Sequence, residues 1–80
     1  MRALHEIANE IWDTWDGVNY AAKPYLYAMG DCDSINDMYG MDSAKSVVLY
    51  FLSNAGTWRG PDAKRIKAVL KEMVGMKRRA

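Results

Sequence analysis

The sequence contains little of the chemistry that zinc sites and disulfides need. Its 80 residues include one histidine, His5, and one cysteine, Cys32. The Cys/His pairs of a structural zinc site cannot be made from one of each, and a lone cysteine cannot form a disulfide within the chain. Stability must therefore come from packing, and the low cysteine content favours a reducing, intracellular compartment.

Long apolar runs are absent as well. Charged residues interrupt the apolar ones every few positions, so no stretch approaches the roughly 18 residues needed to cross a bilayer. The opening residues, 1–6, lead directly into an amphipathic pattern, and we expect neither a signal peptide nor a membrane partner. These features predict a cytoplasmic protein.

Catalytic spacings are also missing. The single histidine lies near the start of the chain and the serines are scattered, so nothing places a nucleophile beside a base. Gly56 and Gly60 flank Trp58 and Arg59, but the lysine and hydroxyl residue of a phosphate-binding loop do not follow. We expect a protein that is not an enzyme, with no cofactor and no catalytic residue.

The stretch DCDSINDMYGMD, residues 31–42, contains four aspartates and invites comparison with a calcium loop. With Asp31 at position 1 of such a loop, position 5 is Ile35, position 6 is Asn36 instead of glycine, and position 12 is Asp42 instead of glutamate. Asp42 is also well placed to cap a following helix. We interpret this aspartate loop as a connection between helices and expect no metal.

What the sequence does contain is helical periodicity. Half of the residues are hydrophobic, and they recur at intervals of three and four. The expected elements are a helix from Leu4 ended by Gly17, a short helix from Pro24 ended by Gly30, one helical turn over Ser34 to Met38, a helix capped by Asp42 and ended by Gly56, and a helix from Pro61 to Val74 ended by Gly75. The predicted fold is all-α, a small compact bundle of three longer helices plus one or two short ones. It forms one domain, residues 1–75, and the basic tail, 76–80, is expected to fray.

One segment has a β alternative. The β-branched pair Val47 and Val48 within VVLYFL is compatible with a strand. The three-and-four spacing through Phe51 and the flanking Ala, Lys and Ser residues favour a helix, which we place at the centre of the bundle.

Charge is divided between the two halves of the chain. Residues 1–42 hold eight acids against two bases, a net charge of −6, and residues 43–80 hold nine bases against two acids, a net charge of +7. Such a division fits either charged partners or attraction between two parts of one domain. We favour the second interpretation.

Each charged surface is nevertheless a candidate binding site. The acids of the first helix could imitate the charge of phosphates; they are Glu6, Glu10, Asp13 and Asp16. At 100° per residue, Lys64, Lys67 and Lys71 fall within about 60° of each other. This basic ridge and the tail residues Lys77, Arg78 and Arg79 are candidates for nucleic-acid binding through phosphates.

The aromatic residues offer a third kind of candidate. Trp58 lies between two glycines and beside Arg59. It either folds back over the bundle as a lid or anchors a partner, since Trp and Arg are common in interface hot spots. We favour the lid, and keep Trp58, Arg59 and Tyr39 as partner-binding candidates, with Tyr27 as a further surface aromatic.

Three stretches carry a resemblance to known proteins: EIANEIWDTW, NYAAKPYLYAM and SINDMYGMDSAKSVVLYFLSNAGTWRGPDAKRIKAVLKEM. Together they resemble a group of short uncharacterised proteins encoded by bacteriophages and prophages. That resemblance implies a protein of the infected host's cytoplasm, in a group many of whose members bind and disable a host machine, including CRISPR and other defence systems. It transfers no functional residue.

Two functions follow as hypotheses. The first is a non-enzymatic phage accessory protein that binds a host protein complex stoichiometrically, for example as an inhibitor of host defence such as CRISPR. The second is a small nucleic-acid-binding module that uses its basic C-terminal helix. An apolar central helix in a half-apolar chain is also compatible with a homodimer.

Overall fold

The computed structural model describes residues 3–75, with only the backbone described at Tyr39. Its first helix, α1, spans Leu4–Thr14. Leu4, Ile7 and Ile11 share its buried face, as their spacing predicts. The Glu6 carboxylate accepts a hydrogen bond from the Ala3 N–H (3.2 Å), which satisfies a donor ahead of the first turn.

Two short helical elements come next, and the second begins directly after the first. The 3₁₀ helix η1 spans Tyr20–Ala22 and helix α2 spans Lys23–Met29. Pro24 is accommodated in the first turn of α2, where its missing N–H costs no helical hydrogen bond. Ala22, Leu26 and Met29 are fully buried and hold these elements on the core.

The aspartate loop contains a small β-hairpin that the sequence did not predict. Strand β1, Met38–Tyr39, pairs antiparallel with β2, Asp42–Ser43, across a turn in which Gly40 has φ 63°. The helical turn expected over Ser34 to Met38 is wrong. The Asp37 carboxylate instead accepts hydrogen bonds from the Asp33 and Ser34 N–H groups (2.7 and 3.2 Å), which closes a non-helical loop.

Helix α3 spans Ala44–Ser53, so VVLYFL is helical and not a strand. Its cap corrects a second expectation. Ser43, not Asp42, is the N-cap, because the Ser43 hydroxyl accepts a hydrogen bond from the Ser46 N–H (3.1 Å). Asp42 is paired with Tyr39 in the hairpin and exposed.

Helix α4 spans Pro61–Met73, with Gly60 before it at φ 115° and Gly75 after it at φ 81°. Both values are favourable for glycine and strained for other residues. Ala63, Ile66 and Leu70 form its buried face. The predicted helix and its stop signal are confirmed.

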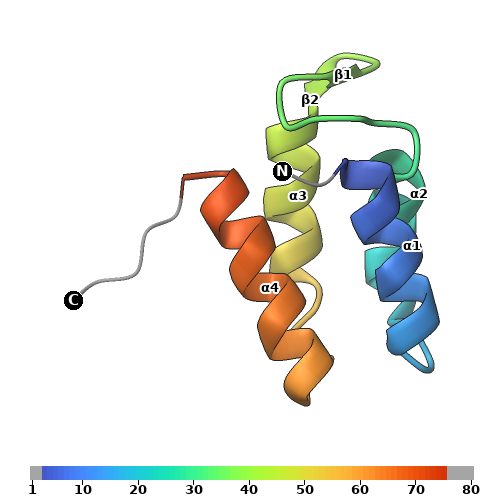
Figure 1. Ribbon diagram of the computed structural model, residues 1–80. Helices are drawn as coiled ribbons and strands as arrows, with labels where there is room; N and C mark the ends of the chain where they lie inside the picture. Colours follow the sequence, from blue (N-terminus) through green and yellow to red (C-terminus); the bar gives the residue numbers. More distant parts are fainter. Residues whose placement is uncertain (1–2, 76–80) are drawn as a thin grey trace.

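The chain is mostly helical, as expected for the all-α class. In Figure 1, α4 is on the left and α1 on the right, α3 is seen behind them, and the hairpin projects at one end of the bundle. Helix α2 packs mainly against α3 and also against α1, while α1 packs against α4. Within residues 3–75, no helix is long and apolar enough to cross a membrane.

Candidate functional site

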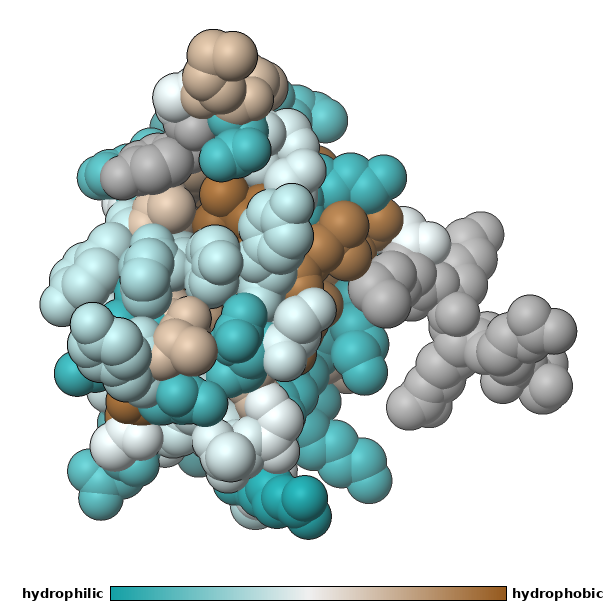
Figure 2. All heavy atoms as spheres, turned by 180° about the vertical axis from the view of Figure 1, so that it is seen from behind, coloured by the Kyte–Doolittle hydropathy of each residue, from teal (hydrophilic) through white to brown (hydrophobic). Residues whose placement is uncertain are grey.

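A surface with exposed aromatic side chains lies on η1 and α2, where two tyrosines face solvent. Tyr20 is 87% exposed and Tyr27 63% exposed. Figure 2 shows the molecule from behind, where pale side chains of intermediate hydropathy lie beside both brown apolar and teal hydrophilic ones. Exposed rings that lie together form the kind of contiguous apolar surface that marks binding sites.

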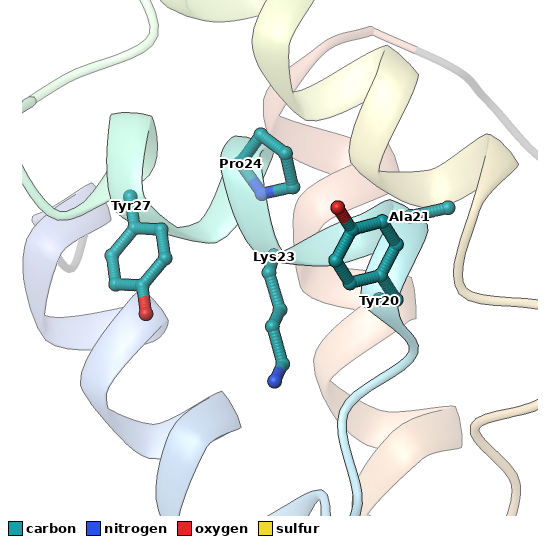
Figure 3. Close-up of a pocket in the computed structure, with 5 residues that line it drawn as sticks. All are labelled: Tyr20, Ala21, Lys23, Pro24 and Tyr27. Atoms are coloured by element: carbon teal, nitrogen blue, oxygen red, sulfur yellow. The ribbon is translucent and has the colours of Figure 1, made fainter.

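Between these two tyrosines lies a groove of about 380 Å³. Five residues line it, and we call it the tyrosine groove: Tyr20, Ala21, Lys23, Pro24 and Tyr27. In Figure 3 the rings of Tyr20 and Tyr27 stand on either side of the Lys23 stem, and Pro24 lies above them. The lining is therefore rings and methylene groups with one cation.

Local structure explains why these side chains point outward. The side-chain carbonyl of Asn19 accepts a hydrogen bond from the Ala21 N–H (3.0 Å) and caps η1. The Asn19 amide also donates to the Asn54 backbone oxygen (3.4 Å), which ties η1 to the end of α3. With Ala22 and Leu26 fully buried, the opposite side of these turns must face water.

Neighbouring aromatic rings support the groove from the side. The Trp12 and Tyr27 ring centroids lie 5.3 Å apart, so helix α1 holds the Tyr27 ring in place. Tyr25 and Tyr50 make a similar contact at 5.6 Å, linking α2 to α3. Rings packed in this way lose less conformational entropy when a partner binds.

Trp58, predicted to be a lid and kept as a partner-binding candidate, lies in the core. It is 3% exposed, and its ring stacks on Trp15 with centroids 5.2 Å apart and planes 10° apart. Phe51 meets the same ring edge-on at 6.4 Å. The lid interpretation is confirmed, and the anchor interpretation is wrong for this fold because the ring has almost no free surface.

Lys67, a member of the basic ridge, secures this lid. Its ammonium donates to the Trp58 backbone oxygen (2.7 Å) and lies 5.8 Å from the centre of the Trp58 ring. Burial lowers the pKa of Lys67, and the nearby charges of Lys71 and Arg59 lower it further. Lys67 thus has a structural role within the basic ridge. The charges of Lys71 and Arg59 lie near it, so three cations gather around the Lys67 ammonium.

The other bases are placed differently. Arg59, Lys64 and Lys71 are exposed. The predicted tail residues Lys77, Arg78 and Arg79 lie outside the described residues, as does the side chain of Tyr39.

The acids predicted as a phosphate-like surface differ in their surroundings. Glu6 is used at the start of the helix, and Arg65 pairs with Glu10 (2.8 Å) and with Asp62 (3.2 Å). The hydrogen bonds that the Arg65 guanidinium donates to Glu10 and then to Asp62 raise the pKa of Arg65. Asp13 and Asp16 are exposed. The ion pair between Arg65 on α4 and Glu10 on α1 joins the two helices, so the basic and acidic halves of the chain attract each other here.

The aspartate loop offers little to a metal or a nucleophile. Its Asp33 carboxylate contacts the His5 ring (3.0 Å), and within residues 3–75 no three His, Cys, Asp or Glu side chains are grouped as metal ligands. Cys32 is 1% exposed, and burial, followed by the charges of Asp37, Asp31 and Asp33, raises the pKa of its thiol. A protonated, buried thiol is a poor nucleophile.

Sequence reasoning missed most of the tyrosine groove. It identified Tyr27 as a surface aromatic but gave no binding role to Tyr20, Lys23 or Pro24. The available signal was the segment NYAAKPYLY, in which three tyrosines cannot all face the core once Ala22 and Leu26 do.

Comparison with protein families, with curated proteins and with solved structures finds no match to this chain.

Proposed function

We propose that this protein acts by binding a partner protein stoichiometrically, and that the tyrosine groove is its contact surface. The observation that carries the proposal is the exposure of Tyr20 and Tyr27 on either side of an apolar groove. Tyrosine is enriched among the residues that dominate binding energy, because its ring buries a large area while its hydroxyl remains satisfied. The groove replaces Trp58 as the main candidate.

The biological setting follows from the resemblance to short phage and prophage proteins. In this proposal the protein is a non-enzymatic phage accessory protein in the host cytoplasm, and its partner is a host complex such as a CRISPR or other defence system. The bundle of three longer helices, α1, α3 and α4, is the frame that presents the short α2.

A pull-down from host lysate tests the proposal. Tagged wild-type protein should retain a partner that mass spectrometry identifies and that reconstitutes a complex of fixed stoichiometry when purified. Tyr20→Ser should reduce retention about tenfold or more, the loss expected of a hot-spot residue. Because Tyr20 is 87% exposed, this variant should unfold at the wild-type temperature.

The matched control is Lys64→Glu with Lys71→Glu, which alters exposed residues on α4. It should retain the partner like the wild type. Equal retention by the wild type and Tyr20→Ser would contradict the groove as the contact surface, and recovery of no specific partner would contradict the function.

A second candidate function is nucleic-acid binding, favoured by the cations gathered around Lys67. Lys71 and Arg59 are close enough to lower its pKa, and such a concentration of positive charge attracts phosphates. A gel-shift assay near about 50 mM salt should then show retention that falls steeply as salt rises. Lys64→Glu with Lys71→Glu should abolish that retention, and absence of any retention by the wild type would remove this function.

A further inference from the structure

The tyrosine groove combines flat apolar walls with a single cation, and this combination specifies a ligand. We propose that it binds an extended, proline-containing segment of the partner that carries one carboxylate, which pairs with Lys23. The inference rests on the proposed function and names the chemistry recognised at the same site.

The first support is the shape and length of the groove. Its lining residues extend from Tyr20 to Tyr27 along a 3₁₀ turn and an α-helix. At about 1.5–2 Å per residue this distance is roughly 11 Å. A polyproline II segment rises about 3.1 Å per residue, so three or four of its residues fit.

The second support is the helical backbone of the lining. The groove is built on the 3₁₀ helix η1 and the helix α2 and includes no strand. It therefore offers no sheet edge to which a partner could add a strand. A polyproline II segment suits such a surface because its own backbone needs no protein hydrogen bond.

The third support is the chemistry of the walls. Tyr20, Tyr27 and Pro24 present rings, and Lys23 presents its methylene stem between them. Aromatic-lined grooves are the surfaces on which proline-rich segments dock, because a rigid segment loses little entropy on binding.

Charge completes the specification. Lys23 is the only Lys or Arg in residues 3–42, a region with eight acids. Of the ion pairs among the described residues, none involves Lys23. A carboxylate next to a proline ring bound in the groove would neutralise the Lys23 ammonium. A single cation in the lining matches one carboxylate, and it does not form the track of cations that a nucleic-acid strand needs.

The test uses two capped peptides of about eight residues, each with three prolines, one with a glutamate after the prolines and the other with a lysine in its place. Both are titrated into the full-length, ¹⁵N-labelled protein. The glutamate peptide should shift amide signals within residues 20–27 and bind at least about fivefold more tightly than the lysine peptide. Lys23→Glu should reverse that preference.

Lys45→Glu, which changes an exposed lysine on α3, is the matched control and should leave the preference unchanged. The proposal is overturned if neither peptide shifts residues 20–27, or if Lys23→Glu leaves the preference as it was. A thymidine oligonucleotide that shifts the same amides more strongly than the peptides would also overturn it. If the peptides fail while Tyr20→Ser still loses the partner in the pull-down, the segment chemistry is wrong and the proposed function stands.

Discussion

At the scale of single residues, burial separates structural aromatic side chains from those free to bind. Trp58 and Tyr20 both lie outside the long helices, yet Trp58 stacks on Trp15 inside the core and Tyr20 stands in water. The difference has a local cause. Lys67 holds the Trp58 backbone over the bundle, whereas the cap at Asn19 leaves Tyr20 pointing outward.

We predict that Trp58→Ala destabilises the protein by about 3–5 kcal/mol, the usual cost of removing a buried aromatic ring. Arg59→Ala, at the neighbouring exposed position, should change stability little. Urea unfolding followed by circular dichroism measures both. If Trp58→Ala does not fold, Trp58→Phe provides a milder variant, and a stability equal to wild type for either Trp58 variant would refute the lid.

A second prediction concerns the cap of α3. Ser43→Ala should cost about 1 kcal/mol, because the Ser46 N–H loses its acceptor. Asp42→Ala should cost less than about 0.5 kcal/mol, as expected for an exposed surface residue. Thermal and urea unfolding distinguish the two positions, and a larger loss at Asp42 would show that the aspartate is the true cap.

Asp37 makes stability depend on pH. Its carboxylate accepts hydrogen bonds from the Asp33 and Ser34 N–H groups, and these bonds lower its pKa. A carboxyl group whose pKa is lowered on folding stabilises the protein above its unfolded value of about 3.9, and that contribution is lost as pH falls through the lowered value.

The wild type should therefore be more stable than Asp37→Asn at about pH 6, and the difference should shrink towards about pH 3. Asn36→Ala alters the same loop without removing a carboxyl group, so its difference from the wild type should be the same at both pH values. Unfolding by urea at the two pH values measures this, and an unchanged or growing difference for Asp37→Asn would contradict the assignment.

At the scale of elements, helices were predictable and their junctions were not. The apolar spacing of Leu4, Ile7 and Ile11 identifies α1 because that spacing must bury one face. Ser43 and Asp42 are equally good caps by residue type, and only the hairpin decides between them. The tyrosine groove also eluded prediction, because η1 has no apolar period that would reveal which way Tyr20 points.

The junction between α1 and α4 gives a prediction of its own. Arg65→Met should lower stability at low salt, because Arg65 bridges Glu10 on α1 and Asp62 on α4. The loss should shrink near 1 M salt, where the screening length is about 3 Å. Lys64→Met is the control at the adjacent exposed position. Equal losses at both salt concentrations would mean that Arg65 acts through packing and not through charge.

At the scale of the whole molecule, the candidate surfaces lie apart. In Figure 1, α4 with its exposed lysines lies at one edge of the bundle, while α2 with the tyrosine groove lies behind α1 at the other. The acids of α1 and the bases of α4 are candidates for two binding faces. They are partly paired with each other, because Arg65 on α4 binds Glu10 on α1. What distinguishes the surface of η1 and α2 is exposed aromatic area, and this is why we propose the groove as the binding surface.

The most direct test of this assignment is hydroxyl-radical footprinting of the protein alone and in complex with the purified partner. We predict strong protection of Tyr20 and Tyr27 in the complex. Met41, which is 95% exposed at the hairpin turn, should be labelled equally in both states. Protection of Met41 or of residues 64–71, with Tyr20 and Tyr27 labelled as in the free protein, would contradict the account.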